Sequence, residues 1–499
     1  MKLKFFNTRP MLAIFLALIV GILLTNYFFM SKISFIILLL AYLVILVFYT
    51  IYYKRLVILL VMLTVSIIGS FGLYAQIYNY NKDLVINTGS VIVGRIDRKE
   101  NKYYNNFIIS ELKIDNKKCE GRLEVFCIDD TEMNLQEGHT VSFVVKDIER
   151  YSFKTDKDIV HEENLELNIK YSVTTEEMIV VESEKSLRSS IKNKVKENLS
   201  KGLSNENTEL MYSTLFGDKT TINRTIYDQY LITGVGHILA VSGLHVGIIV
   251  GLILALFKKI KVNKYFKIVF IFTFLLFYCY LCSWTPSVIR ASIMSIILSF
   301  AYICFREYDR LSAISFAGSI ILLITPSALF NVSFLLSFMS ILGITLICPI
   351  LKKGLMKLNL YNKFTDIILI STAIVFGVMM VSIYIFESIN PMGIISNVIV
   401  LPIFTLIFSV VFVIGFIPFA GSSLIIINPV IDIVNIAVNF LTNLSRSVIA
   451  NEVTFLSTLI YAILLMFISK FNLKKGKAKL LSIMAISAIL ALQIGLSFI

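Results

Sequence analysis

Long apolar runs recur along this chain and restrict what it can fold into. They span about 11–30, 33–53 and 56–77, and then follow one another from about 230 to the last residue. A helix of about 20 apolar residues crosses the hydrocarbon core of a bilayer. Only 16% of the residues are charged, against about 25% in soluble domains. We therefore predict a polytopic α-helical membrane protein with roughly ten to thirteen transmembrane helices.

The basic residues indicate how these helices are oriented. Lysines and arginines cluster in alternate predicted loops, at 2–9, 54–55, 258–267, 306–310, 352–363 and 470–479. Loops rich in Lys and Arg stay on the cytoplasmic side of a membrane. The rule predicts a multi-pass protein with a cytoplasmic N-terminus and an extracytoplasmic segment at 79–227. We expect the first helix to be uncleaved, because further spans follow at once and no A-x-A site closes it. The net charge of +13 then reflects topology and gives weak support for nucleic-acid binding.

Composition divides the chain into four parts. These are N-terminal transmembrane helices at 1–78, a polar insert at 79–185, an amphipathic basic helix with a linker at 186–227, and the main transmembrane domain at 228–499. In the insert, alternating runs predict strands at 91–96, 107–109, 121–126 and 140–145. Five or so short strands predict a small extracytoplasmic β-barrel. The basic helix is expected to lie on the membrane surface or to pack on the barrel.

The charge of the insert bears on what it could bind. Segment 81–185 holds 15 Lys and Arg against 22 Asp and Glu, whereas a groove that binds a single strand is normally basic and lined with aromatic rings. The aromatic and basic candidates for such a groove are Tyr103, Tyr104, Phe107, Phe126, Tyr151, Phe153, Arg95, Arg98, Lys99 and Lys102. The alternative is that the aromatic side chains fill the core of the barrel.

Two of the six cysteines lie in the predicted extracytoplasmic insert. Cys119 and Cys127 could form a disulfide in an oxidising compartment, although their spacing alone does not establish the geometry. The other four cysteines fall in apolar runs, where we expect them to pack as small hydrophobic residues.

The most specific pattern begins at residue 215. Leu215-Phe216-Gly217-Asp218-Lys219 is followed at 234–247 by Gly-Val-Gly-His-Ile-Leu-Ala-Val-Ser-Gly-Leu-His-Val-Gly. Three further segments follow in order: Trp-Thr-Pro-Ser-Val-Ile-Arg-Ala-Ser-Ile-Met at 284–294, a Thr-Pro to Leu-Ser-Phe segment at 325–338, and a segment with Asn397 at 391–402.

These segments resemble the signature of the ComEC-type competence family, whose members take up DNA in natural transformation. The resemblance implies a channel domain at 228–499 in a bacterial cytoplasmic membrane, an oligonucleotide-binding (OB)-like barrel in the insert, and single-stranded DNA as the substrate. It also implies separate partners: a DNA receptor, a nuclease and a cytoplasmic motor. Longer family members carry a C-terminal metallo-β-lactamase-like domain. The four histidines here lack its H-x-H-x-D-H spacing, so we expect a short form that has no metal, no cofactor and no enzymatic activity.

The residues of the signature also predict which face of their helix packs against a neighbouring helix. Gly243, Gly247 and Gly251 recur every four residues, a spacing that allows close approach of another helix. On a helix turning about 100° per residue, His245 lies opposite this glycine face. One side is therefore expected to pack, and the other to present polar groups to a lumen.

Polar residues at membrane depth are the candidates for the lumen, because burying them in lipid is costly. The predicted lining residues are His237, Ser242, His245, Arg290 and Asn397, with Glu387, Asn390, Asp432 and Arg446 as weaker candidates. The alternative for each histidine is a hydrogen bond to another helix. Arg290 could instead pair with Glu387 or Asp432.

Two other functions use the same residues. One is transport of a small anionic solute or an envelope component. The other is intramembrane hydrolysis by Ser242 activated by His245, although no third group is evident and the G-x-S-x-G elbow is missing. The chain also lacks a phosphate-binding loop of the G-x-x-x-x-G-K-[ST] type, so any driving force is expected from a partner.

Overall fold

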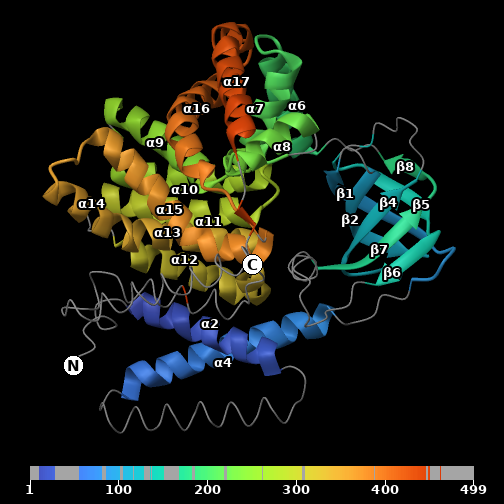
Figure 1. Ribbon diagram of the computed structural model, residues 1–499. Coiled ribbons are helices and arrows are strands. Elements are labelled where there is room, and N and C mark those ends of the chain that lie inside the picture. Colours follow the sequence, from blue (N-terminus) through green and yellow to red (C-terminus); the bar gives the residue numbers. More distant parts are fainter. Residues whose placement is uncertain are drawn as a thin grey trace. The chain divides into compact units, whose positions relative to one another are not determined.

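The structure is a computed structural model that describes residues 10–28, 56–80, 86–101, 105–115, 117–128, 135, 137–150, 168–182, 186–218, 222–260, 262–305, 309–386, 388–445, 448–449 and 461. The chain folds as two compact units (Figure 1). We call them the sheet unit, within 9–194 and 315–331, and the helical unit, within 195–314 and 332–499.

The sheet unit contains a helix pair and a sheet. Its helices are α2 (Pro10–Phe28), α4 (Leu56–Tyr80), the start of α6 (Leu187–Ser200), the end of α12 (Arg310–Ile324) and η3 (Pro326–Phe330). Its strands are β1 (Val91–Asn101), β2 (Asn105–Ile114), β3 (Lys117–Lys118), β4 (Arg122–Cys127), β5 (Thr140–Val144), β6 (Asp147–Arg150), β7 (Ile169–Thr175) and β8 (Met178–Glu182).

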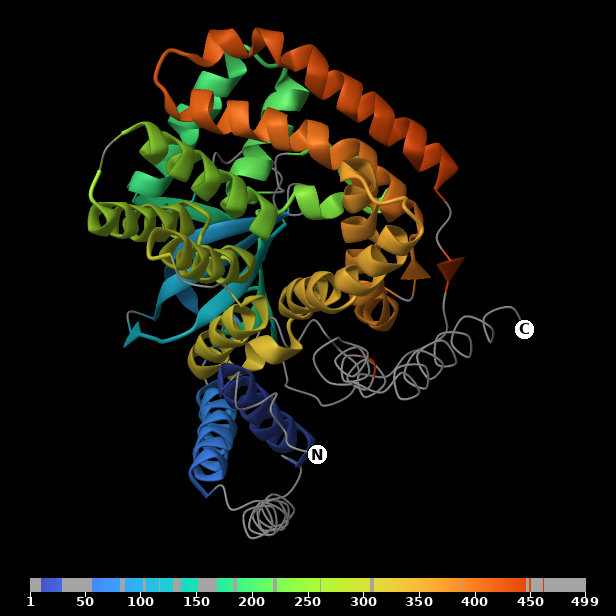
Figure 2. The ribbon, with the colours of Figure 1, turned by 90° about the vertical axis from the view of Figure 1, so that its left-hand side faces the viewer.

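The helical unit holds the remaining elements. They are α7 (Asn205–Phe216), α8 (Arg224–Ile232), η2 (Gly236–Ile238), α9 (Gly243–Lys259), α10 (Lys264–Leu281), α11 (Pro286–Ile303), α13 (Val332–Leu346), α14 (Cys348–Lys357), α15 (Lys363–Phe386), β9 (Ser388–Ile389), α16 (Met392–Phe416), η4 (Gly421–Ile426), α17 (Asn428–Leu444) and β10 (Val448–Ile449). Figure 2 shows α16 and α17 side by side, folded back on each other through η4.

Six helices among the described residues are long and apolar enough to cross a membrane. They are Val61–Tyr80, Lys264–Leu281, Pro286–Ile303, Val332–Lys357, Lys363–Phe386 and Met392–Phe416. Two shorter apolar helices are Pro10–Asn26 and Arg310–Ile324. The predicted helical fold with a separate small sheet is confirmed, and the six helices are consistent with a multi-pass membrane protein. The number of ten to thirteen spans stays a prediction, since 33–53 and most of 450–499 lie outside the described residues.

Small residues bring α2 and α4 together. A Cβ atom on Gly21 would lie 2.1 Å from the backbone oxygen of Ser66, so only glycine allows this approach. The hydroxyl of Ser70 donates a 2.8 Å hydrogen bond to the carbonyl oxygen of Gly21. Close packing at small residues replaces the hydrophobic effect as a cause of helix association in lipid. The pair matches the predicted spans at 11–30 and 56–77.

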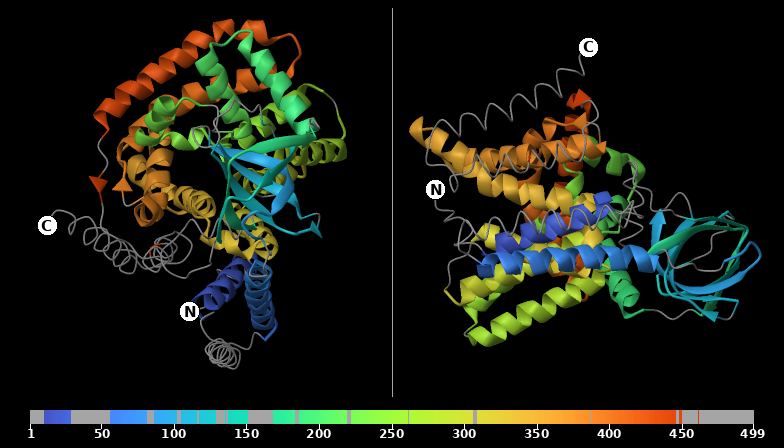
Figure 3. Two further views of the ribbon diagram at one scale, coloured as in Figure 1. Left: turned by 90° about the vertical axis from the view of Figure 1, so that its right-hand side faces the viewer. Right: turned by 90° about the horizontal axis from the view of Figure 1, so that it is seen from below.

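The strands form one mixed sheet that curls on itself (Figure 3). Its order is β6-β7-β4-β2-β1-β5-β8, with β3 paired to β2. Only two residues separate β7 from β8, yet β7 pairs with β4 and β8 pairs with β5 near the opposite end of the order. The sheet must therefore curl until these ends approach each other. The four predicted strand runs correspond to β1, β2, β4 and β5, whose alternating positions bury Val125 and Phe143.

The sheet places the candidate stacking residues differently. Phe107 is 2% exposed and belongs to the core of the sheet. Phe126 is half-buried, and Arg95 lies 3.8 Å from the carboxylate of Glu111. Tyr103, Tyr104, Tyr151, Phe153 and Lys102 lie outside the described residues, as do the side chains of Arg98 and Lys99. For Phe107, the core alternative is therefore the correct one.

The possible disulfide between Cys119 and Cys127 is not formed in this structure. Cys119 and Cys127 are both free thiols. Cys119 precedes β4 and Cys127 ends it, so the extended strand keeps them apart by roughly 16 Å over its own length. A disulfide needs Cα atoms within about 7 Å.

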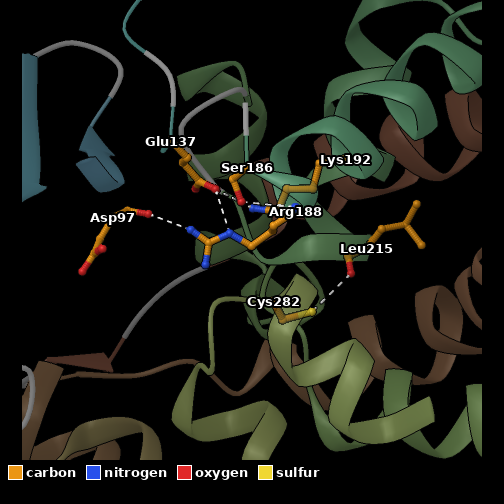
Figure 4. A network of polar contacts seen from close by, with 7 residues as sticks. All are labelled: Asp97, Glu137, Ser186, Arg188, Lys192, Leu215 and Cys282. Atoms are coloured by element: carbon orange, nitrogen blue, oxygen red, sulfur yellow. Dashed lines mark hydrogen bonds and ion pairs between the residues drawn. The ribbon is translucent and has the colours of Figure 1, made fainter. Parts of the chain in front are cut away.

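The predicted basic helix is two helices, α6 and α7. Ser204 caps α7 by accepting a 3.3 Å hydrogen bond from the backbone N–H of Asn207. At the start of α6, the buried Lys192 donates a 3.2 Å bond to Glu137 of the sheet unit. Figure 4 shows Arg188 reaching both Glu137 and the backbone oxygen of Asp97. These contacts support the alternative in which this helix packs on the sheet.

Candidate functional site

The Leu215-to-Asp218 element forms the end of α7. Gly217 adopts a left-handed conformation with φ 78°, which terminates the helix and favours glycine. The carbonyl oxygen of Leu215 accepts a 2.7 Å bond from the hydroxyl of Tyr278. It also accepts a longer contact from the thiol of Cys282, which Figure 4 shows. This element is therefore fixed to the last turn of α10. Lys219 lies outside the described residues.

The glycine-led signature is not one continuous helix. Residues 236–238 form the 3₁₀ turn η2, and α9 begins only at Gly243. The predicted single helix placed His237 on one of its faces. In the structure, His237 lies on η2 instead, and its side chain is exposed. Ser242 is extended, with φ −115° and ψ 173°, and serves as the N-cap of α9.

Ser242 and His245 contact each other as helix-capping residues. The backbone N–H of Ser242 donates a 3.0 Å bond to Nδ1 of His245, and the hydroxyl oxygen of Ser242 also lies 3.0 Å from Nδ1. Histidine here takes the place of the Glu or Gln of a capping box. Nδ1 is shared between the backbone N–H and the hydroxyl of Ser242, and among the described residues no third group orients the ring through Nε2, as a base that activates a serine requires.

Loss of the Ser242 hydroxyl should therefore cost little. We expect Ser242→Ala to lower the free energy of unfolding by about 1 kcal/mol, the usual effect of removing an N-cap side chain, while the backbone bond to His245 remains. Thermal unfolding in detergent measures the loss. A fluorophosphonate probe is expected to label neither the variant nor the unchanged chain; labelling that depends on Ser242 would favour the hydrolase instead.

His245 packs α9 against α16. Its ring is fully buried, with ring centroids 4.5 Å from Phe408 and 5.9 Å from Phe404. Within the described part of the chain, its buried Nε2 atom has no hydrogen-bond partner. A buried polar atom of this kind is costly and calls for a ligand, a water molecule or a change of state.

The glycine face of α9 is largely open among the described residues. Gly243, Gly247 and Gly251 are exposed, and no described atom lies within 4 Å of a Cβ built on Gly247 or Gly251. The opposite face, with His245, is the one that packs. The helical period correctly separated the two faces of α9. Glycine content alone did not identify the packed face, because aromatic side chains of α16 pack against the face that carries His245.

Arg290 is buried in α11 at 2% exposure. Its Nη2 atom donates to the backbone oxygen of Ser333 at 2.6 Å and to the hydroxyl at 3.1 Å, and the guanidinium lies 5.8 Å from the ring centre of Phe334. The weaker candidate Asp432 instead accepts a 2.6 Å bond from Asn207. Glu387 and Arg446 lie outside the described residues.

Asn397 lies on α16 and is 5% exposed. Its side-chain oxygen, and the hydroxyl of the neighbouring Ser396, are buried with no hydrogen-bond partner among the residues that the structure describes. Asn390 precedes the same helix and donates both to the backbone oxygen of Ile232 and to the hydroxyl of Ser445. Its contacts fix the start of α16 to the end of α8.

The signature segments contact one another inside the helical unit. Gly234, in the left-handed region with φ 78°, approaches Gly393 so closely that a Cβ would lie 2.9 Å from its Cα atom. His245 meets α16, which also carries Asn397, and Arg290 meets Ser333. Of the five predicted lining residues, a direct contact joins Ser242 to His245; Arg290 and Asn397 are buried elsewhere, and His237 is exposed.

Sequence reasoning missed a polar ladder along α17. Its members recur every three or four residues: Asn428, Asp432, Asn435, Asn439 and Thr442. Asn207 of α7, which is 1% exposed, donates to Asn428 and Asp432 and accepts from Asn435. On α8, Tyr230 donates a 2.9 Å bond to Asn435, and Gln229 donates a 3.0 Å bond to Asn439.

The other side of α17 is apolar and exposed. Ile433, Ile436, Phe440 and Leu444 are each more than half exposed. The buried residues of α17 are the apolar Ile431, Val434, Val438 and Leu441, and the polar ladder runs beside them, with Asp432 and Asn439 exposed. The signal was in the sequence, since the polar residues repeat at helical spacing in an apolar segment.

Metal chemistry gains no support from the described residues. Within them, no group of three or more His, Cys, Asp or Glu side chains is arranged to hold a metal ion. His139 is buried in the sheet unit, and His161 lies outside the described residues.

Comparisons with known proteins agree with the signature. The family model described as Competence protein matches residues 214–476. An uncharacterized protein of Aquifex aeolicus is 31% identical over 134 residues, which are 27% of this chain and 32% of that protein. Recombination protein 2 of Haemophilus influenzae is 28% identical over 135 residues, covering 26% of this chain and 17% of the relative.

ComE operon protein 3 of Bacillus subtilis is 30% identical over 134 residues, which are 27% of this chain and 17% of the relative. The matched region thus spans about a third of the first relative and about a sixth of the other two. No solved structure matches the chain.

Proposed function

The chain belongs to the competence protein family, and from this premise we propose that it is a membrane channel for the uptake of single-stranded DNA across the cytoplasmic membrane during natural transformation. The observation that carries the proposal is the match over 214–476, because this region holds every signature segment whose contacts are described above. The names of two relatives, Recombination protein 2 and ComE operon protein 3, are consistent with DNA uptake.

Polar groups inside the helical unit support a path for an anionic strand. Burying a cation among apolar helices is costly, so a buried arginine in such a segment marks a functional position more often than a structural one. Arg290 holds a fixed positive charge close to Ser333. His245 Nε2 and the Asn397 amide oxygen add buried polar atoms. A few such groups would favour phosphates without reading sequence.

The sheet unit is proposed to be an OB-like domain on the extracytoplasmic side. The curled sheet and its parallel β4–β7 pair support a small barrel. Segment 81–185 has more acidic than basic residues, so its net charge does not favour strong binding of a DNA strand. In this proposal the chain supplies the pathway and performs no catalysis. A separate receptor, nuclease and cytoplasmic motor would capture, degrade and pull the DNA.

The proposed orientation predicts where the two thiols of the sheet unit can be reached. Cys119 and Cys127 are free and half-buried. In intact cells, a membrane-impermeant maleimide should label them from outside without prior reduction, because segment 79–227 is extracytoplasmic. The control is a chain with both residues changed to serine, which keeps the four other cysteines. Labelling only after cell lysis would contradict the orientation.

Deletion of the gene in a transformable host tests the function itself. With labelled duplex DNA, we expect surface-bound label to remain and the internalised strand to disappear, and a plasmid copy of the gene should restore uptake. Transformation that survives the deletion would contradict the proposal. Loss of uptake of a labelled anionic metabolite, with DNA uptake unchanged, would favour the small-solute transporter.

A further inference from the structure

The turn between α10 and α11 has an unusual backbone. Ser283 and Trp284 both lie in the left-handed region, with φ 57° and φ 55°. This region is uncommon for any residue other than glycine, and a bulky side chain there is an outlier. Strain of this kind persists only where the surrounding structure fixes it, and it concentrates at functional positions. The sequence therefore keeps an aromatic ring where glycine would relieve the strain.

Hydrogen bonds hold this turn in place on both sides. The backbone N–H of Trp284 donates a 2.8 Å bond to the carbonyl of Cys279, and that of Thr285 donates to Cys282. The same turn of α10 is fixed to the end of α7, since Tyr278 donates to the carbonyl oxygen of Leu215. The Trp284 ring is 49% exposed and projects from a backbone that is already ordered.

The position of this ring relates it to the signature. Trp284 comes six positions after Tyr278, whose hydroxyl bonds to the carbonyl oxygen of Leu215. It also starts the segment that contains Arg290, which lies in the second turn of α11. By the positive-inside rule the basic loop before α10 is cytoplasmic, so this turn is at the outer end of α10 and α11.

Two other exposed aromatic residues provide a comparison. Phe305 and Phe419 also have positive φ values, but each is a single left-handed residue beyond a helix end, a common way to terminate a helix. Phe305 lies at the other end of α11 from Trp284. Trp284 differs in its left-handed neighbour, Ser283, and in following Tyr278 and Cys282, which contact Leu215.

We propose that Trp284 is a stacking platform for a nucleobase of single-stranded DNA at the outer turn between α10 and α11. The inference rests on the proposed function and names one contact of that path. Stacking of a base on an aromatic side chain is sequence-tolerant, as uptake of unselected DNA requires. Loss of one such contact is expected to weaken binding by about tenfold.

The chain contains one tryptophan, so fluorescence excited at wavelengths that tyrosine does not absorb reports on Trp284 alone. With the full chain in detergent micelles, we expect oligothymidylate to quench this fluorescence and an abasic oligonucleotide of equal length to leave it nearly unchanged. Anisotropy of a labelled oligothymidylate measures binding in parallel. Trp284→Gly should keep the fold, because glycine suits the backbone, and weaken binding by about tenfold. Trp284→Phe should retain most of the affinity, and Phe305→Ala should bind normally.

Two outcomes would overturn the inference, and they differ. If the labelled oligonucleotide binds but brominated lipids alone quench Trp284, the residue is an interfacial anchor and the proposed function stands. If no oligonucleotide binds, the stacking inference fails together with the proposed function.

Discussion

Gly343→Leu is expected to remove most of the folded protein from the membrane. Gly343 of α13 faces Gly377 of α15 so closely that a Cβ would lie 2.2 Å from the backbone oxygen of Ala373. The obstacle is backbone, which cannot rotate away, so the two helices would have to separate. Overpacking of this kind costs about 3 kcal/mol or more, a large part of the stability of a typical domain. Immunoblotting of membrane fractions and size-exclusion chromatography in detergent measure the loss.

The matched control is Gly247→Leu on α9. No described atom lies within 4 Å of a Cβ at this position, so we expect normal membrane levels and a normal elution profile. If Gly247→Leu were as damaging as Gly343→Leu, the exposed glycine face of α9 would have to be packed after all, as the periodicity first indicated.

Asn207→Leu is expected to lower the free energy of unfolding by about 3 kcal/mol. The side chain makes three hydrogen bonds in the polar ladder, at 2.9 Å to Asn428, 2.6 Å to the carboxylate of Asp432 and 3.1 Å from Asn435. A bond to a charged group contributes about 1.5–3 kcal/mol and a neutral one about 1 kcal/mol. Leucine has a similar volume, so the loss is one of polar contacts. Thermal unfolding of the purified chain in detergent measures it.

Asn439→Leu provides the comparison for this prediction. Asn439 is exposed and accepts one 3.0 Å bond from Gln229, so its loss should cost about 1 kcal/mol or less. Equal destabilisation by the two variants would mean that Asn207 is not the centre of the ladder.

Much of the local structure could be predicted from the sequence. Long apolar runs predict helices in any membrane protein, because the bilayer leaves the backbone no other partner; α4 at Leu56–Tyr80 follows its run closely. The strands at Val91 and Thr140 follow from alternation, since their inward positions, Val141 and Phe143, fill the core of the sheet. The signature residues were recognised through resemblance, and their pairing follows from the fold.

The packing partners could not be predicted. The faces of α9 were separated by periodicity, but which face packs depends on Phe404 and Phe408, about 160 residues further along the chain. The paired-cysteine hypothesis failed because sequence spacing does not show that an extended strand lies between Cys119 and Cys127. Asp432 was considered as a partner of Arg290, whereas the ladder repeat along α17 assigns it to Asn207.

The central claim is that polar groups within the helical unit lie on the path of DNA, and Arg290→Gln tests it most directly. The change removes the positive charge of the guanidinium that donates to Ser333. The matched control is Arg224→Gln, because the side chain of Arg224 is 73% exposed. Both variants must first reach the membrane at the normal level. With labelled DNA, the account predicts that Arg290→Gln keeps surface-bound label and lowers the internalised strand by about tenfold or more, while Arg224→Gln takes up DNA normally. Unchanged uptake by Arg290→Gln would contradict the account.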